Sequence, residues 1–91
     1  MRIKRTDGNH SLIMEQLRKI GFSVRSLHVV GDGVPDLIAG RNGVNYLFEV
    51  KDPKQPPSKR KLTPDEQEFF DSWQGPVYVI EKIEDVLKII G

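Results

Sequence analysis

The sequence contains no cysteine. This absence excludes a disulfide framework, a thiolate zinc site and a cysteine nucleophile. No apolar run approaches the roughly 20 residues that a membrane-spanning helix needs, and no apolar signal-peptide core follows the basic residues 1–5. We therefore expect a soluble, intracellular protein of the cytoplasm, with the 91 residues forming one domain over 1–91.

An excess of charge of one sign is also missing from the chain as a whole, whose formal net charge is +1, but the charges are unevenly distributed. Residues 62–91 hold seven acidic and two basic side chains, whereas residues 51–61 hold five basic side chains and one acidic side chain. Such a stretch by itself indicates a solvated loop. Its position directly after an acidic strand favours contact with a phosphate backbone instead. The residues expected to make that contact are Lys54, Lys59, Arg60 and Lys61, with help from the basic N-terminal tail.

The apolar periodicity predicts an α/β fold with the element order αβββαβα. The predicted elements are a helix from about residue 8–10 to 19–20, a strand over 22–30, two hairpin strands around 42–43, a helix from 64, a strand over 77–80 and a closing helix with apolar residues from 83 to 90. Residues 52–62 are too rich in proline for a helix or a central strand. Because the hairpin strands are apolar on both faces, helices should cover both sides of the sheet.

The helix from residue 64 has the clearest start signal in the chain. Thr63 is the expected N-cap, Pro64 occupies the first helical position, and Glu66 completes a capping box. Its apolar face, formed by Phe69, Phe70 and Trp73, is expected in the core rather than as a platform for stacked bases.

The dipeptide Asn42-Gly43 predicts a two-residue type I′ turn, because both central residues of that turn need positive φ. Arg41 then pairs with Val44, and the same register sets Asp36 directly opposite Glu49. Lys51 lies two residues beyond Glu49 and therefore shares its face. Two carboxylates and an ammonium at one end of an apolar hairpin are suited to a divalent cation and an activated water. The alternative is a plain ion pair between strands, such as Lys51 with Asp36.

These residues resemble the PD-(D/E)XK nuclease superfamily, and in particular its compact stand-alone VRR-NUC branch. The resemblance is carried by Gly33-Val34-Pro35-Asp36-Leu37, Phe48-Glu49-Val50-Lys51, and Leu62-Thr63-Pro64 with a downstream Gln67. It spans the chain from about Asn9 to the closing helix. It implies a restriction-endonuclease-like αβββαβα core, with a mixed sheet flanked by helices on both faces.

The resemblance also implies roles for individual residues. Asp36 and Glu49 would bind Mg²⁺ or Mn²⁺ together with the backbone carbonyl of Val50. Lys51 would orient or deprotonate the attacking water, or stabilise developing charge. Gln67 would position Lys51 or the water, although an exposed helical glutamine fits the pattern equally well.

His10 stands where the family often has a carboxylate, on the same helical stripe as Ile13. It is therefore either a further catalytic residue, perhaps with Asn9, or a half-buried or capping histidine. Glu15 falls on the opposite, solvated side of that helix.

The expected function is cleavage of phosphodiester bonds in branched DNA, such as four-way (Holliday) junctions, by a metal-dependent endonuclease acting as a homodimer. DNA and a second copy of the chain are the expected partners, and neither a membrane nor a small-molecule cofactor is expected. One alternative is a nuclease of the same fold that nicks ordinary duplex or cuts for a partner protein. The other is a catalytically silent DNA-binding module.

Overall fold

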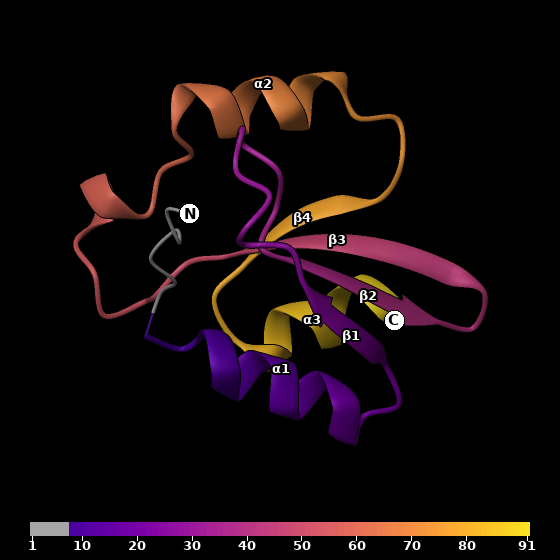
Figure 1. Cartoon of the computed structure of the whole chain (residues 1–91). Coiled ribbons are helices and arrows are strands. Elements are labelled where there is room, and N and C mark those ends of the chain that lie inside the picture. The colour runs from indigo at the N-terminus through magenta and orange to yellow at the C-terminus, as the bar shows by residue number, and fades with distance from the viewer. Residues whose placement is uncertain (1–7) are drawn as a thin grey trace.

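The computed structural model describes residues 8–91, which form a four-stranded sheet with helices on both faces (Figure 1). The basic N-terminal tail, expected to contact DNA, lies outside the described residues. The elements in chain order are α1 (His10–Lys19), β1 (Ser23–Ser26), β2 (Leu37–Arg41), β3 (Val44–Val50), the single 3₁₀ turn η1 (Pro57–Lys59), α2 (Pro64–Ser72), β4 (Val77–Ile80) and α3 (Ile83–Ile90). The helices of this part of the chain are too short to cross a lipid bilayer.

The sheet is mixed and has the strand order β1-β2-β3-β4. Its first three strands are antiparallel, and β4 pairs with β3 in parallel. The predicted hairpin is confirmed, since Arg41 pairs with Val44 and both turn residues have positive φ, 52° at Asn42 and 79° at Gly43. A period of two from this turn fixes which face every hairpin side chain occupies.

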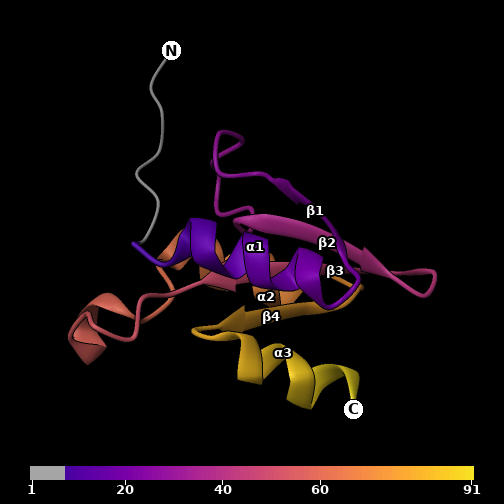
Figure 2. The same cartoon turned by 90° about the horizontal axis from the view of Figure 1, so that it is seen from below.

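The core lies between the sheet and the helices α1 and α3, which cover the same face (Figure 2). Side chains from both layers are fully buried there, and each contributes about 1.5–3 kcal/mol on leaving water. The core residues are Ile13, Leu17, Phe22, Val24, Leu37, Ala39, Phe48, Val50, Ile80 and Val86. Ile13, which the sequence placed on an apolar stripe of α1, is in this core, and Ile20 and Tyr46 are partly buried against it.

Helix α2 covers the other face, but its aromatic residues are not the core residues that we expected. Trp73 is 48% exposed, and its ring stacks on Phe69 with 4.9 Å between centroids. Phe70 is only half-buried. The reason is that the only buried residue of α2 is Glu66, in its first turn. The helix is therefore held at its N-terminal end rather than along its length.

The strand predicted over 22–30 is shorter than expected and ends at Ser26. Leu27 donates its N–H to the carbonyl of Asp36 at 2.6 Å, and the chain then turns, with Val30 N–H bonded to the Leu27 carbonyl at 2.9 Å. The segment up to Asp36 rises toward α2 before β2 begins (Figure 1). It thereby connects the sheet to the first turn of α2.

Gly33 makes the contact between this segment and α2. Its φ is +77°, and a Cβ at this position would overlap the carbonyl oxygen of Asp65 and lie 2.9 Å from the Glu66 nitrogen. Gly31 has a similar φ of +74°, but a Cβ there would meet nothing within 4 Å. The two glycines therefore share a backbone requirement and differ in their surroundings.

We predict that Gly33→Ala destabilises the fold more than Gly31→Ala does. Both substitutions carry the left-handed penalty of about 1–2 kcal/mol, and only Gly33→Ala adds overlap worth about 1–3 kcal/mol. Urea unfolding of both variants measures the difference. Equal losses would show that the segment does not press on α2.

Candidate active site

Asp36 and Glu49 lie where β2 begins and β3 ends, and their side chains are 6% and 2% exposed. The β2–β3 pairing ends with Leu37 opposite Phe48, and one further step of that register sets Asp36 opposite Glu49. The Asp36 carboxylate accepts a hydrogen bond from the backbone N–H of Val50 at 2.8 Å. Asp36 is therefore fixed through its side chain to β3 and through its carbonyl to Leu27.

Lys51 is 8% exposed and lies between two carboxylates. Its Nζ is 3.0 Å from Oε1 of Glu66 and 3.4 Å from Oε2 of Glu49. Lys51 is therefore paired with these two glutamates. Burial by itself lowers the pKa of this ammonium, but the hydrogen bond to Glu66 and the charges of both glutamates outweigh burial and raise its pKa.

Glu66 is a site residue that the sequence identified only as a helix cap. The capping box is confirmed, and the same Oε1 accepts from the Thr63 N–H at 2.9 Å and from Lys51 Nζ at 3.0 Å. Burial alone raises the pKa of Glu66, but the Thr63 N–H and the Lys51 ammonium outweigh burial and lower its pKa. The only sequence signal was an acid at the third position of a capped helix, which does not tell what lies opposite.

Gln67 was expected to position Lys51 or the attacking water, but its side chain makes a different contact. It is exposed, and its amide donates to the Asp71 carboxylate at 2.9 Å, one helical turn further on. Neighbouring helical residues differ by about 100° in direction, so only one of Glu66 and Gln67 can face the sheet. The structure turns Glu66 inward.

His10 is 5% exposed, and its ring packs edge to face on His28 with 5.8 Å between centroids. The neighbouring Asn9 amide donates to the carbonyls of Lys51 at 3.2 Å and Glu81 at 2.8 Å. The start of α1 is therefore tied to the strand ends where Lys51 lies. A catalytic role of His10 remains a prediction. Glu15 is exposed, as expected, and forms an ion pair with Lys19.

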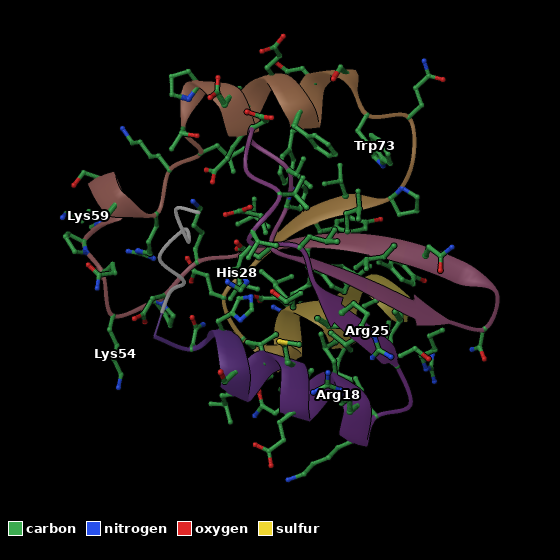
Figure 3. All side chains as sticks on the ribbon, viewed as in Figure 1. Arg18, Arg25, His28, Lys54, Lys59 and Trp73 are labelled. Carbon is green, nitrogen blue, oxygen red and sulfur yellow. The ribbon has the colours of Figure 1, made fainter. Side chains whose placement is uncertain are left out.

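The basic loop leads away from this site (Figure 3). Lys54, Lys59 and Lys61 are exposed, and Figure 3 shows Lys54 and Lys59 on the outer rim of the loop. Arg60 differs from them because its guanidinium forms an ion pair with Glu81 at 3.2 Å and is half-buried. Arg60 therefore holds the loop against the end of β4, and the lysines are the side chains directed to solvent.

The donor set fits a hard divalent cation with few protein ligands. Within residues 8–91, no three His, Asp or Glu side chains are grouped so that they could hold a metal ion. Asp36 of the β2 end and Glu49 of β3 offer carboxylates on one face. Val50, which follows Glu49 in β3, offers its backbone carbonyl. Mg²⁺ commonly uses one or two carboxylates and completes its shell with water and substrate phosphate oxygens.

Comparison with known proteins agrees with this geometry. No family model matches the chain, and no curated protein is similar to it. A solved structure described as a VRR_NUC domain is similar, with 30% sequence identity and a TM-score of 0.60. The match covers 89% of this chain and 88% of that one. At this identity and coverage, the fold and the sequence together show that the chain belongs to the VRR-NUC family of nuclease domains.

Proposed function

We propose that this nuclease domain is a metal-dependent DNA endonuclease whose active site comprises Asp36, Glu49 and Lys51. The observation that carries the proposal is the burial of these three charged side chains at one sheet end, with exposures of 6%, 2% and 8%. Buried charges cost free energy unless they are paired or coordinate a metal. A fold stabilised by an apolar core on the other face has no need of them, so a chemical role accounts for the cluster.

Asp36, Glu49 and the Val50 carbonyl would hold Mg²⁺ or Mn²⁺. When bound, such a cation lowers the pKa of a coordinated water and neutralises charge on the scissile phosphate. The Val50 N–H bond to Asp36 at 2.8 Å fixes that carboxylate beforehand. Preorganised ligands of this kind need no rearrangement when the substrate arrives.

Lys51 would act as an ammonium donor toward the phosphate or the attacking water. Its raised pKa keeps it protonated near neutral pH, which favours charge stabilisation over proton abstraction. Glu66 is the positioning residue, since it holds Lys51 Nζ at 3.0 Å and is itself fixed by the Thr63 cap.

The substrate that we propose is branched DNA. The exposed Lys54, Lys59 and Lys61 supply positive charge beside the site for backbone phosphates. No zinc finger or base-reading helix is present in the described residues, which is consistent with recognition of DNA shape rather than sequence. The second candidate function of the same site is a nuclease that nicks ordinary duplex or cuts on behalf of a partner protein. Comparing cleavage of a four-way junction with cleavage of linear duplex distinguishes the two functions.

We further propose a homodimer, because one site per chain can cut only one strand of a symmetric junction. Strand β4 is the last strand of the sheet, and its outer edge carries no partner strand within residues 8–91. Apolar side chains are exposed on it and around it, namely Tyr78 39%, Val79 40%, Leu87 46% and Trp73 48%. Pairing of this edge with a second copy would cover them.

Asp36→Asn and Glu49→Gln keep the shape of each side chain and remove its charge. We expect either to slow cleavage of a four-way junction by about two orders of magnitude or more, with DNA affinity largely retained. A gel cleavage assay in Mg²⁺ and Mn²⁺ and a binding assay in EDTA measure the two effects. Glu15→Gln, which neutralises an exposed carboxylate of α1, is the control. Cleavage that persists in both site variants would refute the assignment.

Glu66→Gln should slow cleavage about 10- to 100-fold, as the loss of a residue supporting an active-site group does. The amide can still accept from the Thr63 N–H, so the cap persists while the charge beside Lys51 is lost. Because Glu66 raises the pKa of Lys51, the alkaline limb of the pH–rate profile should move to lower pH in the variant. Gln67→Ala tests the opposite assignment: a larger loss there than in Glu66→Gln would show that Gln67 acts on Lys51.

Leu87→Lys should convert the proposed dimer to monomer, because it introduces a charge at an exposed apolar position of α3, the helix that follows β4. The control is Leu12→Lys on α1, which changes a leucine of similar exposure (54% for Leu12, 46% for Leu87) and should leave the dimer intact. Sedimentation equilibrium against the chain mass of 10.4 kDa gives the oligomeric state. A monomeric wild-type protein would end the dimer proposal without touching the nuclease proposal.

A further inference from the structure

Two arginines converge on one backbone carbonyl at the edge of the sheet. Arg18 of α1 donates from Nη2 to the carbonyl of Val24 at 3.2 Å, and Arg25 of β1 donates from Nη1 to the same oxygen at 3.1 Å. The two donor nitrogens therefore cannot be further apart than the sum of these two distances, which brings the guanidinium groups close together. Both side chains are exposed (Figure 3).

Capping the edge of β1 uses only one donor nitrogen of each arginine. The Val24 carbonyl can accept both hydrogen bonds, but each guanidinium brings five N–H groups and a full positive charge. Two like charges at this distance repel each other unless an anion lies nearby. Within residues 8–91, neither arginine forms an ion pair with a carboxylate.

An open hollow of about 510 Å³ lies beside the pair. Besides the two arginines, its lining includes Ser23, Ile38, Gly40 and Asn45, and no acidic side chain of the described residues lines it. A second hollow shares Ser23, Gly40 and Asn45 and adds Arg41. This surface thus combines positive charge with hydrogen-bonding side chains.

The hollow lies at the β1 edge of the sheet, where Arg25 pairs with Ile38 and faces the side of the proposed active site, whereas Arg18 reaches the edge from α1 on the other side. Ile38 and Gly40 continue the alternation from Asp36 along β2, and Asn45 does the same from Glu49 along β3. Arg25 pairs with Ile38, which pairs with Leu47, so Arg25 lies two residues along the strands and two strands across from Glu49, a diagonal of about 12 Å. A DNA strand advances about 3.4 Å per nucleotide along the duplex axis, so the span corresponds to about four nucleotides.

The basic loop lies on the other side of the site. Figure 3 shows Lys54 and Lys59 at one end of the molecule and Arg18 and Arg25 toward the other, with His28 between them. Because the basic loop begins directly after Lys51, a DNA strand held by both the loop and the arginines would pass the end of β3, where Glu49 lies.

We propose that Arg18 and Arg25 form a second phosphate-binding subsite, which holds the DNA backbone about four nucleotides from the bond that is cut. This inference rests on the proposed nuclease function, because the active site supplies the reference point. Guanidinium groups suit it, since their planar forks donate two parallel hydrogen bonds to a phosphate. The subsite sets a minimum length for the DNA arm on the β1 side.

The test compares the variant R18Q/R25Q with wild type on DNA arms of different length. Glutamine can still donate to the Val24 carbonyl, so the strand edge stays capped. The control is K82Q/K88Q, which removes the same number of charges from exposed lysines of the C-terminal segment. Fluorescence anisotropy in EDTA measures binding without cleavage, and thermal melting verifies that each variant is folded.

On a long arm, R18Q/R25Q should bind about tenfold more weakly than K82Q/K88Q, with a salt slope reduced by about 1 to 2. On an arm trimmed to two nucleotides beyond the cleavage position, R18Q/R25Q and K82Q/K88Q should bind alike. A loss that is independent of arm length, or no greater than that of K82Q/K88Q, would overturn the subsite.

The two proposals fail separately. If Asp36→Asn abolishes cleavage but R18Q/R25Q binds long arms normally, the nuclease function stands and the subsite is refuted. If length-dependent binding requires Arg18 and Arg25 but no metal supports cleavage, the DNA contact stands and the nuclease proposal is refuted. Inorganic phosphate at millimolar concentration should compete with a long arm in wild type only weakly, because it offers one phosphate where the backbone offers several.

Discussion

The ammonium of Lys51, held between Glu49 and Glu66, is the interaction on which the arrangement of the site depends. It joins the end of β3 to the first turn of α2, two elements that share little other buried contact. All three groups are at least nine-tenths buried, so removing any one would leave an uncompensated charge in a poorly solvated place. The ion pair therefore fixes the position of α2 and, through Glu49, one half of the acidic pair.

The fold divides its two faces between stability and chemistry. Helices α1 and α3 cover the apolar face, where side chains such as Leu17 and Phe48 are fully buried. The opposite face carries the charged cluster and is covered by α2 only near Glu66, which leaves Trp73 half-exposed. The apolar core therefore stabilises the fold from one face, and the charged cluster holds α2 on the other.

Membership of the VRR-NUC family agrees with a site assembled at one end of a hairpin. The charge distribution adds what the family name does not state. Basic side chains stand on both sides of the acidic pair, on the loop at Lys54 and Lys59 and at the β1 edge at Arg18 and Arg25. In the proposed function, a cation bound by Asp36 and Glu49 would offset their repulsion of the scissile phosphate, while the basic side chains would hold the neighbouring phosphates.

The sequence by itself determined the hairpin register, the apolar stripe of α1 and the capped start of α2, because each depends on neighbours within a few residues. Asn42-Gly43 sets the turn, and Ile13 and Leu17 mark the stripe. Thr63 and Glu66 form the cap. Only the tertiary structure decided that Glu66 rather than Gln67 meets Lys51, that the aromatics of α2 stay outside the core, and that β1 ends at Ser26. Those outcomes depend on how far and at what angle α2 lies from the sheet. A periodic pattern gives the direction of a side chain around its own helix, but the partner on the other side comes from a distant segment.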